Sequence, residues 1–137
     1  MSNTKSIGVA FEDQDIIGSD RILSKEYLGY IDGAHDVVTQ GTSKATAVTL
    51  NKSAGTITLN AASLNAATTV NFVLNNSYLN ALSTVILTLA NSGATAGAYT
   101  AIISTVSAGA ATVTIRNITA GALAETIVLN FAIIHQV

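Results

Sequence analysis

Short segments in which apolar residues recur at every second position dominate the chain from residue 46 onward. In residues 69–75, TVNFVLN, the apolar side is formed by Val70, Phe72 and Leu74. In residues 126–134, TIVLNFAII, it is formed by Ile127, Leu129, Phe131 and Ile133. This period is typical of half-buried β-strands. The predicted strands are 46–50, 56–60, 69–75, 84–90, 98–106, 111–118 and 126–134.

Seven strands with one apolar face each predict an all-β fold, because such faces become buried when two sheets pack against each other. We expect an antiparallel β-sandwich or jelly-roll-like body. Gly55 in NKSAG and Gly109 in SAGA stand where a short hairpin needs a left-handed residue, so both turns are predicted to be hairpins. The longer connections at 61–68 and 76–83 are expected to be crossovers rather than helical turns.

Charged residues are few and unevenly distributed. The chain has 14 of them, six Lys/Arg and eight Asp/Glu, where an average composition of about 25% would give roughly 34. Residues 1–36 hold ten, seven of them acidic, and residues 53–137 hold two. We therefore predict two parts, an extended N-terminal arm (1–38) and a nearly neutral β-sandwich domain (39–137).

Several partners are disfavoured by composition. The net charge is −2 and the sequence has no basic run, so no nucleic-acid partner is expected. No run of about 18 apolar residues exists, so no membrane partner is expected. The absence of cysteine excludes disulfides. The first residues turn acidic at Glu12 rather than forming a secretory signal, which favours folding in a cytoplasm.

Arg116 and Glu125 are the only charged side chains after Lys52. A lone pair of this kind in an apolar setting could be catalytic, but no nucleophile and base accompany it. A salt bridge within or between subunits, or two unrelated surface charges, is the preferred interpretation. Arg116 is expected to point away from Val113 and Ile115. His35 and His135 lack the neighbours of a catalytic triad or a metal site, so no enzyme activity is predicted.

The acidic stretch EDQDIIGSD partly matches a calcium-binding loop, in which Asp13, Asp15 and Gly18 would occupy positions one, three and six. The match fails at Ile17 and Ser24, where an oxygen ligand and a bidentate glutamate are required. No metal and no cofactor are therefore predicted.

Several strings of the sequence form a recognisable cassette. They are VVTQGTSKATAVTLNKSAGTITLNAASL at 37–64, NNSY at 75–78, SGATAGAY at 92–99 and GALAETIVLNFAII at 121–134. Together they resemble a β-domain of structural proteins from tailed bacteriophages, used as a small head decoration (cement) protein or attached to tail and fibre components. The N-terminal SIGVAFEDQDI also resembles small virion proteins. This family brings no catalytic residues with it.

The resemblance implies a virion structural protein on the outer surface of the head, made in the host cytoplasm. It implies the major capsid protein as a partner and self-association as a homotrimer. The arm would supply the capsid contacts, namely Ile7, Val9, Phe11, Glu12, Asp13, Asp15, Asp20, Arg21, Tyr27 and Tyr30. The residues expected at contacts between subunits are Tyr78, Tyr99, Arg116 and Glu125.

Other functions remain open at this point. A tail- or fibre-associated module could contact the host surface through the connections at 61–68, 76–83 and 91–97, although the chain has no heptads for a fibre shaft. A small hydrolase would need a nucleophile and a base, which the sequence does not present. A carbohydrate-binding module would normally present exposed Trp or Tyr, and the chain has no Trp.

Overall fold

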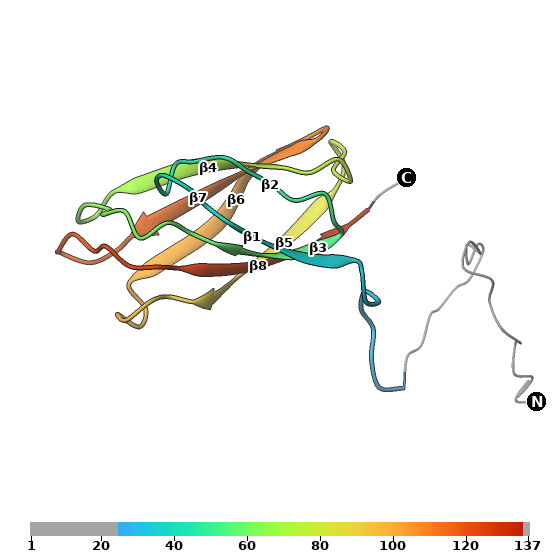
Figure 1. Ribbon diagram of the computed structural model, residues 1–137, viewed down its shortest axis with the longest axis horizontal. Helices are drawn as coiled ribbons and strands as arrows, with labels where there is room; N and C mark the ends of the chain where they lie inside the picture. Colours follow the sequence, from blue (N-terminus) through green and yellow to red (C-terminus); the bar gives the residue numbers. More distant parts are fainter. Residues whose placement is uncertain (1–24, 136–137) are drawn as a thin grey trace, which may run out of the picture.

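The computed structural model describes residues 25–135 and contains eight β-strands and no helix in that range (Figure 1). The strands are β1 (His35–Thr39), β2 (Val48–Thr49), β3 (Ala54–Thr58), β4 (Thr69–Asn75), β5 (Thr84–Asn91), β6 (Tyr99–Ser107), β7 (Ala110–Asn117) and β8 (Val128–Ile134). The prediction of an all-β protein is confirmed. One strand, β1, was not predicted.

The strands form two four-stranded sheets that lie as two layers (Figure 1). The first sheet has the order β1-β3-β8-β5 and the second the order β2-β4-β7-β6. Four of the six strand pairs are antiparallel as expected, but the sheets are mixed, because β1 pairs with β3 and β2 with β4 in parallel. Every connection except β6–β7 crosses from one sheet to the other. β1 and β3, like β2 and β4, are therefore separated by one strand of the opposite sheet, and each pair runs in the same direction.

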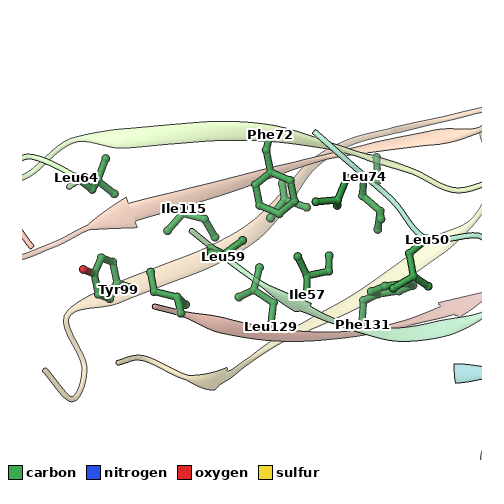
Figure 2. Close-up of a cluster of buried hydrophobic side chains, with 14 of the residues drawn as sticks. Leu50, Ile57, Leu59, Leu64, Phe72, Leu74, Tyr99, Ile115, Leu129 and Phe131 are labelled. Carbon is green, nitrogen blue, oxygen red and sulfur yellow. The ribbon is translucent and has the colours of Figure 1, made fainter. Parts of the chain in front are cut away.

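The core lies between the two layers and is built from the predicted faces. Phe72 and Leu74 of β4 point toward Leu129 and Phe131 of β8, with Ile57 of β3 between them (Figure 2). All five side chains are buried. Each contributes about 1.5–3 kcal/mol by transfer from water, so this row of contacts holds the sheets together.

The two predicted hairpins have different outcomes. Gly109 joins β6 to β7 with a φ of 78°, so this hairpin is confirmed. Gly55 is not in a turn, because residues 50–53 cross between the sheets and Gly55 itself lies in β3, opposite Phe131. A Cβ atom there would lie 2.7 Å from Phe131 Cε1 and 2.9 Å from Leu50 Cδ1. The glycine makes room for two core side chains.

The predicted boundary at residues 38 and 39 falls inside β1. The first sheet begins at His35, and the segment before it is tied to the same end of the body. The Tyr30 hydroxyl donates to the Ile133 carbonyl, Lys52 Nζ donates to the Gly33 carbonyl at 2.7 Å, and Ala54 N donates to the Ala34 carbonyl at 3.1 Å. Residues 30–38 therefore contact the body.

Candidate interaction surfaces

The outward face of the first sheet contains no Asp, Glu, Lys or Arg side chain. Strand alternation and register place one set of residues on it: His35, Val37, Thr39, Ala54, Thr56, Thr58, Thr84, Ile86, Thr88, Val128, Asn130, Ala132 and Ile134. Polar side chains connect across the strands, since His35 Nε2 lies 3.0 Å from Thr56 Oγ1 and Thr56 Oγ1 donates to Asn130 Oδ1 at 2.8 Å. We call this set the first-sheet face.

The outward face of the second sheet is similar but carries one charge. Its residues follow from the register of β2, β4, β6 and β7: Thr49, Thr69, Asn71, Val73, Asn75, Thr100, Ile102, Thr105, Ser107, Ala110, Thr112, Thr114 and Arg116. Arg116 is exposed and lies between Thr69 and Thr100 in register. It points away from buried Val113 and Ile115, as predicted. We call this set the second-sheet face.

The open edges of the sheets are irregular rather than flat. On β5 the register shifts between Leu89 and Asn91, and on β6 it shifts between Ile103 and Thr105, so each strand carries one extra residue. On β1, Asp36 Oδ1 accepts the amide of Val37 at 2.8 Å. Bulges and edge charges hinder edge-to-edge pairing. The chain has no proline, yet these open edges are protected by bulges and by an edge charge.

A buried lysine links two connections at one end of the body. Lys44 is 3% exposed, and its Nζ donates to the carbonyls of Asn60 at 2.5 Å, Ala62 at 2.8 Å and Glu125 at 2.7 Å. Burial lowers the pKa of Lys44, and the Glu125 carboxylate acts in the opposite direction. An ammonium group has three donors, and here all three are satisfied by backbone carbonyls. Lys44 therefore serves the fold rather than a reaction.

Next to Lys44, Glu125 and Tyr99 form a partly satisfied polar pair. Glu125 Oε1 accepts the Thr95 hydroxyl at 2.6 Å. Tyr99 Oη and Glu125 Oε2 are buried without a hydrogen bond of normal geometry in the described part of the chain. Burial, and then the Glu125 carboxylate, raise the pKa of Tyr99. Figure 2 places Tyr99 at the Leu64 end of the core.

These positions bear on the residues expected between subunits. Tyr99 is 4% exposed and belongs to the core, so it offers no contact area to a second copy. Glu125 Oε1 accepts a hydrogen bond from Thr95 of its own chain. Within residues 25–135, no ion pair joins Glu125 to Arg116. Arg116 and Tyr78 are exposed and remain available for contacts.

Sequence reasoning did not single out Lys44, because Lys44 lies in a turn, where the two-residue alternation of a strand does not apply. Glu125 did carry a signal, since it is in phase with buried Ile127 and Leu129 at the entrance to β8. A charged residue in phase with a core face is expected to need internal partners. By the same count, Arg116 is out of phase with the buried side chains of Val113 and Ile115, which predicts that its side chain is exposed.

Only two of the expected capsid contacts lie in the described residues. Tyr27 is exposed and Tyr30 half-exposed, and they adjoin the exposed apolar residues Leu28 and Ile31. The other expected contacts lie outside the described residues: Ile7, Val9, Phe11, Glu12, Asp13, Asp15, Asp20 and Arg21.

Residues 25–135 contain no pocket and no group of three or more His, Asp or Glu side chains that could hold a metal ion. In the same range, no helix is long and apolar enough to cross a membrane. Comparison with protein-family models, curated proteins and solved structures found no match. The function is therefore argued from the surfaces described above.

Proposed function

We propose that the protein is a non-enzymatic virion structural protein that decorates and stabilises the assembled head of a tailed bacteriophage. The observation that carries the proposal is the pair of sheet faces, which together expose one charged side chain, Arg116. Protein surfaces that stay in water are usually rich in charge, whereas the centres of interfaces are depleted of it. Neutral faces on both sides of one sandwich suit a subunit that is covered by neighbours.

The exposed apolar segment before β1 supports a second contact, with the major capsid protein. Tyr27, Leu28 and Ile31 are each more than four-fifths exposed, and tyrosine is enriched at interfaces because it combines a large apolar ring with a polar end. The preceding acidic residues would pair with basic groups on the shell. Deletion of residues 1–20 removes most of the expected contacts of the arm and is expected to weaken binding to heads, and unchanged binding would contradict this role of the arm.

The mechanism would be stabilisation by binding. A protein that binds the assembled head better than its disassembled form lowers the free energy of the assembled state. A symmetric oligomer, proposed to be a homotrimer, would make several weak contacts at once and gain avidity from them. The protein would be made in the host cytoplasm and lie on the outer surface of the head.

The copy number of the chain in purified particles tests this proposal. Quantitative mass spectrometry against the major head protein should find a number comparable to that protein or a simple large fraction of it. A handful of copies would contradict decoration and favour a tail- or fibre-associated module. In that case the connections 61–68, 76–83 and 91–97, at the ends of the sandwich, would be the surfaces to mutate.

A further inference from the structure

We propose that Asp32 is a site of spontaneous isomerisation to isoaspartate in the folded protein. Asp32 is followed by Gly33, and this pair is the one place in the chain where Asp or Asn precedes a glycine. Glycine permits the reaction because it has no Cβ that would keep its backbone nitrogen away from the preceding side chain. The proposal does not depend on the proposed function, since it concerns the chemistry of one turn.

Asp32 and Gly33 form the centre of an exposed turn before β1. Ala34 N donates to the Ile31 carbonyl at 3.2 Å, which closes the turn, and Gly33 has a φ of 87°, as the third residue of a type II turn requires. Both central residues are exposed. Within residues 25–135, neither the Asp32 carboxylate nor the Gly33 amide takes part in a hydrogen bond. The two reacting groups are therefore adjacent, open to water and without a competing partner.

The step is an attack of the Gly33 backbone nitrogen on Cγ of Asp32. A C–N bond forms, and the carboxyl hydroxyl leaves with the amide proton as one water molecule, so that a succinimide ring results. Water then opens the ring at either carbonyl carbon. Opening at Cγ restores aspartate, whereas opening at the backbone carbonyl carbon leaves Cγ bonded to the nitrogen and gives isoaspartate. Water is the only co-reactant, and the product has the mass of the original chain.

Asp36 has the same side chain but lies in surroundings that oppose this reaction. It belongs to β1, where Asp36 pairs with Gly55 and Val37 with Thr56 of β3. The side chain of Val37 is branched at Cβ and crowds the amide that would have to attack. Rotation of the backbone at Asp36 would also require β1 to leave the sheet. The two aspartates therefore supply a comparison within one segment of the protein.

Isoaspartate at residue 32 would alter the junction between the arm and the body. The chain through an isoaspartate is one atom longer, because Cβ becomes part of the backbone. Asp32 lies between two contacts that hold this segment on the body. Before it, the Tyr30 hydroxyl donates to the Ile133 carbonyl, and after it, Lys52 Nζ donates to the Gly33 carbonyl at 2.7 Å. We expect the extra atom to break the hydrogen bond that closes the turn and to loosen the segment before β1.

Ageing of the full chain at neutral pH over several weeks tests the proposal. No Lys or Arg lies between Lys25 and Lys44, so trypsin releases both aspartates in one peptide, and electron-transfer fragmentation distinguishes isoaspartate from aspartate at each. Folded wild type should isomerise at residue 32 at least about tenfold faster than at residue 36, which corresponds to about 1.4 kcal/mol in activation free energy. At residue 32 the folded protein and the chain unfolded in guanidinium should react at similar rates.

Asp32→Glu is the matched control, because it keeps the charge and the exposed position but would need a larger ring to react. It should stay unmodified at residue 32 and keep the protection of the Ala34 amide from hydrogen exchange, which aged wild type should lose. Three results would overturn the proposal: no isoaspartate at residue 32 in aged wild type, isoaspartate there only in the unfolded chain, and equal rates at residues 32 and 36 in the folded protein. Unchanged exchange of the Ala34 amide in fully modified protein would refute the expected loosening of the turn.

Discussion

Lys44 illustrates how one charged side chain can be required inside a neutral body. Its ammonium group donates hydrogen bonds to three carbonyls in two connections: Asn60 and Ala62 between β3 and β4, and Glu125 between β7 and β8. Lys44→Met keeps the volume and apolar stem but leaves these three part-buried acceptors without the ammonium donor. We expect a loss of at least about 3 kcal/mol in the free energy of unfolding, measured in urea.

Lys52→Met is the matched control for Lys44→Met. Lys52 is half-buried and donates to a single carbonyl, that of Gly33, so this variant should lose less than about 1 kcal/mol. Equal losses in the two variants would mean that the carbonyl contacts of Lys44 contribute little beyond the packing of its stem.

Tyr99 gives the protein a predictable response to alkaline pH. Its pKa is raised above the ordinary value of 10.0, first by burial and then by Glu125. Between these two values the unfolded chain has released the tyrosine proton and the folded chain has kept it, so the free energy of unfolding falls as pH rises. Below pH 10 this contribution is fully present.

Tyr99→Phe should therefore reduce the loss of stability above pH 10. Lys44, whose pKa is lowered, acts in the opposite direction in both proteins, so the difference between wild type and Tyr99→Phe isolates the tyrosine. Near pH 7 the substitution should change stability by less than about 1 kcal/mol, because the hydroxyl has no hydrogen bond of normal geometry. Urea unfolding at several pH values measures both effects, and parallel curves up to pH 11 would contradict the expectation.

At the scale of elements, alternation in the sequence was sufficient to locate most strands but not to arrange them. Residues 69–75 were predicted with the bounds that β4 has, because apolar residues recur there at every second position, at Val70, Phe72 and Leu74. The predicted strand 46–50 shrinks to Val48–Thr49, since Thr46 N donates to the Ser43 carbonyl and closes a turn. β1 was missed because its HDVVT sequence places two valines side by side at an exposed edge.

The parallel pairing of the strands could not be predicted from the sequence. Which strands become neighbours depends on crossings between sheets, and the sequence of a strand does not record its neighbour. The low charge of the body did predict neutral outer faces, but it could not assign Tyr99 to the core. Tyrosine suits an interface and a core equally well on composition alone.

The packing of the Phe131 and Leu50 side chains over β3 depends on Gly55. Its position opposite Phe131 leaves no space for a side chain, since a Cβ would lie 2.7 Å from the phenyl ring and 2.9 Å from Leu50. Gly55→Ala should destabilise the fold by about 1–3 kcal/mol, as overpacked core positions do. Gly41→Ala, with nothing within 4 Å of the new methyl group, is the control in the same thermal unfolding experiment. A Gly55→Ala protein as stable as this control would show that the core adjusts freely around β3.

At the scale of the whole molecule, the position of β1 decides where the arm ends and the body begins. Val38 packs against the core, and β1 covers the edge of β3 over five paired residues. Removing residues 35–39 would uncover that edge and the first residues of the core beneath it. A chain of residues 25–137 should therefore be more stable than one of residues 40–137 by at least about 2 kcal/mol, from lost hydrogen bonds and apolar burial. Both chains retain Gln40, whose amide group bonds the carbonyls of Lys44 and Thr46, so the comparison reports on β1 and the segment before it. Equal urea midpoints for the two chains would mean that β1 adds nothing to the stability of the body. β1 would then belong to the arm, as the predicted boundary near residues 38 and 39 implies.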